Sequence, residues 1–488
     1  MGQKPPEKNI EFADDEIIGV VTTPGNTNTS STMEKNAFSP IICNSQEEQQ
    51  ELEEVGQHHH HHCDNHQLNK RHKGIFGVFL LILHTVIPHG GLLSNSFNLA
   101  SASLGAGIIT LPWAFRATGI IMGVIYLTLM TLFTVYTITI MGYVMKKTGY
   151  RAFEQMSRGV LGRGADYLMA LVMGVSCFGA AVAYVIATES LITPVLKRSP
   201  VTPQFLKTES GIRLSTCGVW LIGMLPLVIP KKVNTLRYFS AIGVSFVVYF
   251  AITVVIHSCQ KGLPRRSEVV FVEKGNVALE GLGVYVFSYL CHAVAYQVYF
   301  EMKVPSVKQL VLATTMGMTF CSLLYLLAGV FGYMEFGNDI EESILYMFDP
   351  IEEPMMMVGY IGLIIKLCVS YALNMIPCRN TVYYIIGWDI DRLPYWKHII
   401  TVTIISVIVL VCGIFIPRIS TALGLAGAVC GGFIGFIYPA LFFMYSGGWT
   451  LVKVGWFHYI MTYLSLLIGV VSVVFGTGAT IYSTFGKS

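Results

Sequence analysis

Charge is scarce in this sequence: only 12% of its 488 residues are Asp, Glu, Lys or Arg, against about 25% in an average soluble domain. Hydrophobic residues make up 53%, which leaves too little polar surface to cover a soluble protein of this length. The net charge is only +3 and the basic residues are scattered, so nucleic-acid binding through a basic patch is excluded. The composition fits a polytopic membrane protein in a lipid bilayer.

The sequence also lacks the patterns of a disulfide scaffold or a catalytic centre. None of its 11 cysteines belongs to a Cys-x-x-Cys pair, which argues against a disulfide framework. No apolar segment holds His or Asp pairs at metal-ligand or catalytic spacing, so we expect neither an enzyme nor a bound cofactor or metal. The His run at 58–62 is typical of a low-complexity tract, with weak metal binding as the alternative.

The first 73 residues differ from the rest in charge. They hold 12 acidic and 6 basic residues, a net charge of −6, whereas the remainder holds 17 and 26, a net charge of +9. A segment this polar cannot bury enough apolar surface to offset the entropy lost on ordering. We therefore predict a disordered, acidic cytoplasmic tail over 1–73, an interfacial lead-in over 74–91 and a transporter-like membrane domain over 92–488.

The membrane domain alternates long apolar segments with short polar loops. About 20 apolar residues are needed to cross the hydrocarbon core as a helix. Eleven segments are predicted to span on this basis: 92–115, 119–145, 167–193, 212–230, 238–257, 279–300, 310–333, 354–377, 398–416, 421–445 and 456–482.

Basic residues set the expected orientation. With the N-terminus in the cytoplasm, the inner loops hold slightly more Lys and Arg than the outer loops. Lys70, Arg71 and Lys73 strengthen this bias, and the loop 337–353 on the opposite side has no basic residue. Eleven spans then put the C-terminus outside. The plasma membrane is the expected location, with an acidic organelle as the alternative.

Two of the eleven segments are interrupted. In the first, Gly105 and Gly107 flank one small residue and Pro112 follows, which predicts either a broken helix or close packing through small residues. In the sixth, the polar stretch 287–292 ends in His292, which near the bilayer centre is either hydrogen-bonded or a proton relay. Interruptions at equivalent positions, first and sixth, indicate an inverted-repeat transporter.

Three stretches carry a family resemblance: 98–112, 287–301 and the Met-Ile-Pro-Cys-Arg of 375–379. They resemble the amino acid/auxin permease family, over roughly 88–488. The Gly-Ala-Gly-Ile-Ile-Thr-Leu-Pro of the first segment and the Cys-Gly-Gly-Phe-Ile-Gly-Phe-Ile-Tyr-Pro of the tenth are most similar to its trypanosomatid branch. That branch includes arginine and lysine permeases and polyamine carriers.

The resemblance implies a fold. It is that of the bacterial leucine transporter: an all-α polytopic membrane protein with a 5+5 inverted repeat plus an eleventh helix, in which spans one and six are broken. The repeats would cover about 92–257 and 279–445, and the eleventh helix about 456–482.

The resemblance also implies which residues hold the substrate. The first break would contact the amino and carboxyl groups of an amino acid, and the sixth would form the opposite wall. The residues so implied are Ser103, Gly105, Ala106 and Gly107 in the first break, and Ser288, Tyr289, Cys291 and His292 in the sixth. In sodium-coupled relatives a span-one Asn and a span-eight Thr mark a sodium site. Asn98 matches the Asn, and Ser370 falls where the Thr would be.

Lys366 bears on ion coupling. It lies one helical turn before Ser370, on the same face of the predicted helix. Its ammonium can take the place of the sodium ion, which would favour proton coupling or uniport. Alternatively it pairs with Glu189 of the third span and is structural.

The leading hypothesis is a secondary active amino acid permease that works by alternating access. A cationic substrate such as arginine or lysine needs an acidic partner, for which Glu189 and Glu301 are the candidates. A neutral amino acid or polyamine permease is the alternative within this class, and a membrane amino acid sensor signalling through the tail is the alternative outside it. The expected partners are the amino acid, H⁺ or Na⁺ and the bilayer, with no nucleic acid.

Overall fold

In the computed structural model, structure is described for residues 91–231, 236–261, 269–272, 279, 281–302, 304–390, 392–416 and 418–485. The predicted tail of 1–73 and all of the predicted lead-in except Gly91 lie outside the described residues. The described residues form helices and no strand.

Nine helical stretches among the described residues are long and apolar enough to cross a membrane. Six of them are single helices: α5 (Ile120–Thr148), α7 (Ala165–Arg198), α11 (Leu236–Lys261), α15 (Val307–Phe336), α16 (Pro354–Ile386) and α17 (Tyr395–Phe415). The other three contain a π-helical segment: α9 (Glu209–Val219) with η1 (Trp220–Met224) and α10 (Leu225–Val228); α18 (Ile419–Leu425) with η5 (Ala426–Ile437) and α19 (Tyr438–Tyr445); and α21 (Trp456–Val471) with η6 (Ser472–Gly476) and α22 (Thr477–Phe485).

Two further spans are broken, as the glycines and the polar stretch predict. The first consists of α3 (Leu92–Ser103) and α4 (Gly107–Thr118), and the sixth of α13 (Leu282–Ser288) and α14 (His292–Glu301). Each half is too short to cross a bilayer alone. The nine continuous stretches and the two broken ones together give the eleven predicted spans.

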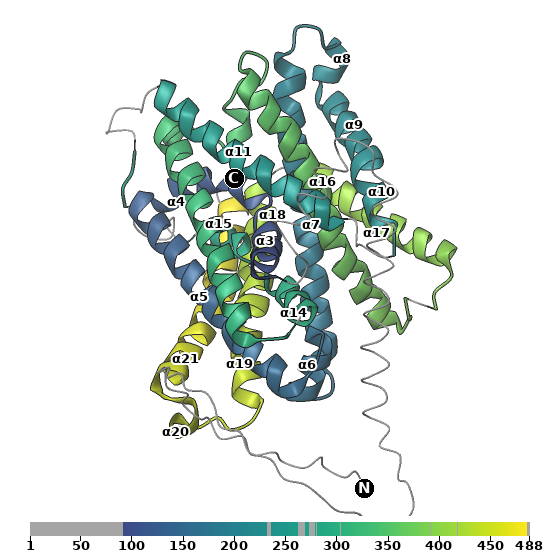
Figure 1. Cartoon of the computed structure of the whole chain (residues 1–488). Coiled ribbons are helices and arrows are strands. Elements are labelled where there is room, and N and C mark those ends of the chain that lie inside the picture. Colours follow the sequence, from purple (N-terminus) through teal and green to yellow (C-terminus); the bar gives the residue numbers. More distant parts are fainter. Residues whose placement is uncertain are drawn as a thin grey trace, which may run out of the picture. The chain divides into compact units, whose positions relative to one another are not determined.

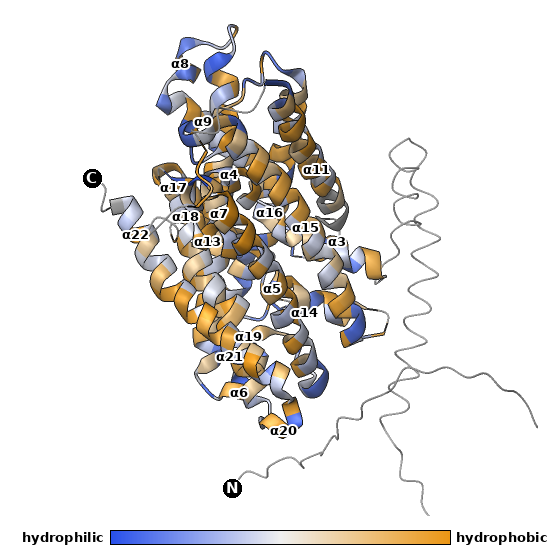
Figure 2. Cartoon of the chain, turned by 90° about the vertical axis from the view of Figure 1, so that its left-hand side faces the viewer, coloured by the Kyte–Doolittle hydropathy of each residue, from blue (hydrophilic) through white to orange (hydrophobic). Residues whose placement is uncertain are grey.

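The two ends of the bundle are marked by short helices (Figure 1). We call the end that carries α8 (Gln204–Lys207) the upper end, and the end that carries α6 (Phe153–Leu161) and α20 (Leu451–Val454) the lower end. Hydrophobic residues cover the helices between these ends, and hydrophilic residues gather at α8 and around the lower end of the bundle (Figure 2). This distribution is what a membrane-spanning bundle requires.

One boundary expected from the sequence is wrong. The eighth span was predicted to end at Pro377, but α16 continues through this proline to Ile386. Past the proline, the fully buried Arg379 donates to the carbonyl oxygens of Val228, Pro230 and Lys231. These bonds satisfy the C-terminal carbonyls of the fourth span and tie them to α16, which offsets the hydrogen bond that the proline cannot make.

Glycines allow the sixth and tenth spans to approach closely. A methyl group on Gly427 of η5 would collide with the carbonyl oxygen of Gly283, and one on Gly283 would collide with that of Gly424. The glycine-rich motif of the tenth span therefore serves backbone-to-backbone packing against α13. This contact helps to fix the position of the sixth-span break.

Candidate functional site

The two breaks of the bundle face each other. α3 ends at Ser103 and α4 begins at Gly107, while α13 ends at Ser288 and α14 begins at His292. A methyl group on Gly107 would collide with Ser288 Oγ, so the two breaks touch at this point. The residues predicted to form opposite walls are therefore adjacent, and only glycine leaves room for this approach.

Two backbone N–H groups in the first break lack a backbone acceptor. Those of Gly105 and Ala106 donate no hydrogen bond within the described part of the chain, although both residues are buried. Buried N–H groups are almost always paired in folded proteins. At the N-terminus of α4 they also lie at the positive end of the helix dipole, which favours a bound anion. The arrangement suits a carboxylate.

The carbonyl groups that these N–H groups would use in an unbroken helix have other partners. An α-helix pairs the N–H of each residue with the carbonyl four residues earlier. The Ser101 carbonyl, expected to pair with Gly105, accepts a bond of 2.9 Å from Lys366 Nζ. The Ser103 carbonyl, expected to pair with Gly107, accepts one of 2.7 Å from Tyr325. Two side chains therefore satisfy these carbonyls of the first break, and the N–H groups of Gly105 and Ala106 are free for a ligand.

Tyr325 links the two breaks directly. Its hydroxyl lies 2.7 Å from the Ser103 carbonyl oxygen and 2.9 Å from the Ser288 carbonyl oxygen. These carbonyls end α3 and α13, and the single O–H of this α15 side chain is shared between the two helix C-termini. The ring is fully buried and stacks edge-on against Tyr289 at 5.5 Å. Tyr325 thereby fixes the spacing between the two walls.

Lys366 lies at the first break and not in an ion pair. Its ammonium donates to both the carbonyl oxygen and the Oγ of Ser101, at 2.9 Å each, and only 1% of the residue is exposed. Within the described residues it has no carboxylate in ion-pair range, so the predicted pairing with Glu189 is not formed. A methyl group on Gly243 of α11 would lie 2.7 Å from Lys366 Cδ, which shows that this glycine makes room for the side chain.

The two predicted sodium-site residues lie on either side of Lys366. Asn98 is half-buried, one turn before Ser101 on α3. Ser370 is buried one turn after Lys366 on α16. The ammonium of Lys366 therefore sits between the first and eighth spans, in the region where the resemblance implied a sodium ion.

His292 is held by a hydrogen bond. Its Nε2 lies 2.8 Å from Thr137 Oγ1 of α5, and the residue is 1% exposed. Its Nδ1 has no hydrogen-bond partner in the described residues. The structure thus places His292 as a hydrogen-bonded interior residue, while the relay role stays a prediction. Cys291, beside it, lies 3.9 Å from the Met318 sulfur.

Two further side chains at the site were, like Tyr325 and Thr137, missed by the sequence interpretation. Tyr184 of α7 covers Gly105, where an added methyl group would lie 2.7 Å from the tyrosine hydroxyl. Asn374 of α16 donates to that hydroxyl at 3.4 Å and to the Ser370 carbonyl at 3.0 Å. The only signal for either is a polar side chain inside an apolar span, since such groups need a partner in the membrane.

Glu189 does not join the breaks. It follows Tyr184 by five residues on α7, which turns it by about 140° and carries it about 7.5 Å towards the upper end. There it lines a cavity of about 500 Å³ with Arg213, Glu341 and Phe415. Glu301, the other acidic candidate, accepts a bond of 2.7 Å from Gln297 at the C-terminal end of α14. Neither carboxylate is in the central site.

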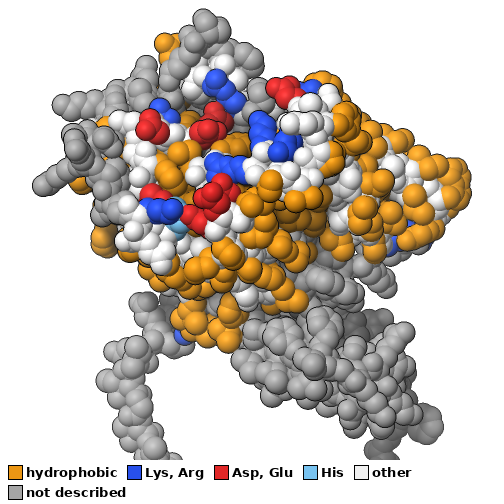
Figure 3. All heavy atoms as spheres, turned by 90° about the horizontal axis from the view of Figure 1, so that it is seen from above, with side chains coloured by type: hydrophobic (Ala, Val, Ile, Leu, Met, Phe, Trp, Pro, Cys, Tyr) orange, Lys and Arg blue, Asp and Glu red, His pale blue; other side chains and the backbone are white. Residues whose placement is uncertain are grey.

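The upper face carries both signs of charge. Seen from above, acidic and basic side chains alternate over this face and are bordered by hydrophobic ones (Figure 3). Arg198 donates to the carbonyls of Tyr346 and Phe348 and lies 3.5 Å from Asp349. The acidic loop 337–353 is therefore in part neutralised and fastened to α7.

Comparisons with known proteins give a family match. A family model described as "Transmembrane amino acid transporter protein" matches residues 88–482. The chain is 27% identical over 370 residues to "Vacuolar amino acid transporter 5" of Schizosaccharomyces pombe, covering 74% of this chain and 86% of that protein. It is 25% identical over 359 residues to "Sodium-coupled neutral amino acid transporter 7" of Xenopus laevis, covering 71% and 78%.

A solved structure has the same fold. The crystal structure of MhsT in complex with L-phenylalanine matches with a TM-score of 0.58 at 15% sequence identity, and covers 80% of this chain and 98% of that chain. At this identity the match supports the fold alone. It confirms the predicted all-α, leucine-transporter-like class with broken first and sixth spans.

Proposed function

Because the chain belongs to the transmembrane amino acid transporter family, we propose that it is a multi-pass secondary transporter that moves an amino acid across its membrane by alternating access. One observation carries this proposal above the others. Gly105 and Ala106 present two buried N–H groups without acceptors beside Gly107 at the N-terminus of α4, opposite the sixth-span break. A substrate carboxylate is the group that such donors fit.

The rest of the site fits the ammonium group and the side chain of an amino acid. The C-termini of α3 and α13 carry the negative ends of their helix dipoles, which favour the substrate ammonium. Ser103 and Ser288 bring these ends together through Tyr325. The two charged groups of an amino acid can thus be held by backbone alone, and Tyr184, Tyr289 and Cys291 remain to surround its side chain.

For the side chain of the substrate we propose a neutral group. The charged residue at the first break is the cation Lys366, and the candidate carboxylates Glu189 and Glu301 lie elsewhere. A cationic side chain would meet a like charge in a low-dielectric site without a counter-ion. The Xenopus laevis relative is named as a neutral amino acid transporter, which supports this choice. Transport of arginine or lysine stays a prediction that the assay below tests.

For coupling we propose that Lys366 substitutes for a bound sodium ion. Its ammonium binds Ser101 between Asn98 and Ser370, where a cation would otherwise find carbonyl and hydroxyl oxygens. The relative named as sodium-coupled is the reason to test sodium directly. Uptake that needs no sodium is the expected result.

For location we propose the plasma membrane, with the N-terminus in the cytoplasm and the C-terminus outside. The Schizosaccharomyces pombe relative is named as vacuolar, so an organelle membrane is the competing location. Epitope tags at each terminus, stained in intact and in permeabilised cells, distinguish these possibilities. A C-terminal tag accessible in intact cells supports the proposal, whereas two inaccessible tags on an internal membrane contradict it.

The experiment that tests the function is uptake by the purified full-length chain in proteoliposomes. Labelled leucine, glutamine, arginine, lysine and putrescine are offered in turn, with protein-free liposomes as the control. Saturable uptake of a neutral amino acid supports the proposal. Uptake of arginine or lysine alone would restore the cationic hypothesis, and uptake of putrescine alone would favour a polyamine permease. Amino acid binding without flux would indicate a sensor.

A further inference from the structure

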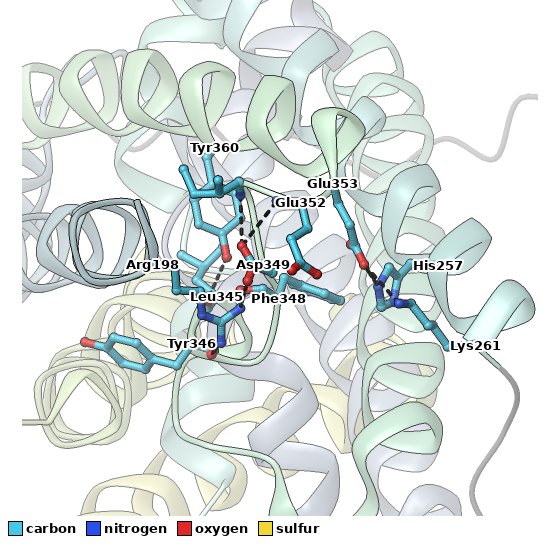
Figure 4. A network of polar contacts seen from close by, with 11 residues as sticks. Arg198, His257, Lys261, Leu345, Tyr346, Phe348, Asp349, Glu352, Glu353 and Tyr360 are labelled. Atoms are coloured by element: carbon cyan, nitrogen blue, oxygen red, sulfur yellow. Dashed lines mark hydrogen bonds and ion pairs between the residues drawn. The ribbon is translucent and has the colours of Figure 1, made fainter. Parts of the chain in front are cut away.

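A histidine at the upper end of α11 lies between two carboxylates. His257 Nδ1 is 2.5 Å from Glu335 Oε1, and His257 Nε2 is 2.9 Å from Glu353 (Figure 4). The side chains are largely buried, with 13% of His257, 4% of Glu335 and 23% of Glu353 exposed. Lys261, one turn further along α11, lies 3.3 Å from Glu353. Nothing in the transport site uses this cluster.

The cluster joins three separate elements. His257 belongs to α11, Glu335 to the end of α15, and Glu353 immediately precedes α16. The loop before Glu353 also presses the Phe348 ring edge-on against the imidazole at 5.0 Å. The imidazole is therefore the common contact of the fifth span, the seventh span and the loop 340–353.

The other attachments of this loop are made by arginine and tyrosine side chains and not by histidine. Arg116 donates to the carbonyl of Ile340 at its beginning, and Arg198 binds Asp349 and the carbonyl of Phe348. Tyr360 donates to the carbonyl of Leu345 (Figure 4). The contact with α11 therefore involves His257 and Lys261, whereas these other attachments depend on arginines and a tyrosine.

The two carboxylates make this arrangement sensitive to protonation. A neutral imidazole carries one N–H and can satisfy only one of them, while its other nitrogen turns a lone pair towards the second. The imidazolium donates to Glu353 and places a positive charge beside Glu335. It also balances the charge, because His257 and Lys261 then oppose Glu335 and Glu353. The other acidic groups of the loop do not alter this balance, since Asp349 is paired with Arg198, Glu342 is paired with Arg418, and Glu341 and Glu352 are exposed.

We propose that His257, Glu335 and Glu353 form a proton-binding site that clamps the loop 340–353 and the start of α16 onto α11 and α15. Protonation of the imidazole closes the clamp. Loss of that proton leaves one carboxylate facing a lone pair and loosens the loop. Histidine is the side chain whose charge ordinarily changes between about pH 5 and 8, so the upper end responds to the pH of the solution that it faces.

Hydrogen–deuterium exchange of the purified full-length chain tests this clamp without reference to transport. Amides of 340–353 are compared at about pH 6 and about pH 8, on either side of the ordinary imidazole transition, after correction for the intrinsic exchange rate. We expect roughly tenfold stronger protection at the lower pH, because the clamp opposes local opening. In His257→Gln this difference disappears. In the control His458→Gln, at the lower end against Tyr136, it remains.

A second variant keeps the test decisive if His257→Gln does not fold. Glu353→Gln replaces a partly exposed carboxylate by an amide of the same size, so it preserves packing while it removes half of the clamp. We expect the pH difference to fall severalfold in this variant. Equal protection of the wild-type loop at both pH values overturns the proposal, as does a full pH difference that persists in Glu353→Gln.

Discussion

At the first break, side chains from other spans replace the backbone hydrogen bonds that an unbroken helix would make. Lys366 takes the Ser101 carbonyl and Tyr325 takes the Ser103 carbonyl, and the N–H groups of Gly105 and Ala106 are free. A buried ammonium is costly unless it is well hydrogen-bonded. The two bonds to Ser101 therefore couple Lys366 to the conformation of the break. Its role is more than that of a compensating charge.

The first residue-scale prediction concerns Lys366→Ala. Removal of the ammonium takes away two hydrogen bonds to Ser101, and hydrogen bonds to charged groups are worth about 1.5–3 kcal/mol each. We expect sodium-free uptake in proteoliposomes to fall by roughly tenfold or more, and added sodium to restore part of it. If the variant transports at the wild-type rate, and its uptake depends on neither sodium nor pH, Lys366 has a purely structural role.

The second residue-scale prediction concerns Gly107→Ala. The new methyl group would collide with Ser288 Oγ, whose position is fixed by its bond to the Val284 carbonyl. We expect uptake to fall at least roughly tenfold, since a barrier increase of ~1.4 kcal/mol has that effect, with the protein still in the membrane. Gly218→Ala is the matched control, because its methyl group would meet nothing within 4 Å. Equal uptake by the two variants would contradict the account.

At the scale of elements, apolar length predicted the eleven spans, and glycine spacing in the first span and a polar stretch in the sixth predicted the two breaks. These signals are local, so the sequence alone carries them. The partners of the breaks were not predictable, because Tyr325, Tyr184 and Thr137 come from spans distant in the sequence. A tyrosine in an apolar helix shows that its hydroxyl needs a partner but not which one. For the same reason the sequence could not show that Glu189 faces away from the breaks.

The element-scale prediction concerns Tyr325→Phe. The change keeps the ring but removes the donor that the C-terminal carbonyls of α3 and α13 share. Leaving buried acceptors unpaired costs about 1–3 kcal/mol, so we expect a lower melting temperature and slower uptake. Thermal unfolding of the purified protein measures the first effect. Tyr482→Phe, in which 59% of the tyrosine is exposed, should leave the melting temperature unchanged. A wild-type melting temperature for Tyr325→Phe would show that the link does not stabilise the bundle.

At the scale of the whole membrane domain, polar chemistry is concentrated in two places. One is the buried pair of breaks, where backbone groups are free for a zwitterion. The other is the upper end, where His257 and Arg198 fasten the loop 340–353 to the fifth, seventh and third spans. In our proposals the first place binds the substrate and the second makes the loop 340–353 sensitive to pH. Both depend on contacts between spans that are distant in the sequence.

The central claim is that the N–H groups of Gly105 and Ala106 bind the carboxylate of the substrate. The most direct test is competition for uptake of the transported amino acid by two unlabelled compounds: the same amino acid, and the amine that remains when its carboxyl group is removed. The account predicts that the amino acid competes fully and that the amine competes at least roughly a hundredfold more weakly, the loss expected for a buried charged group left without its partner. Equal competition by the amine would contradict it.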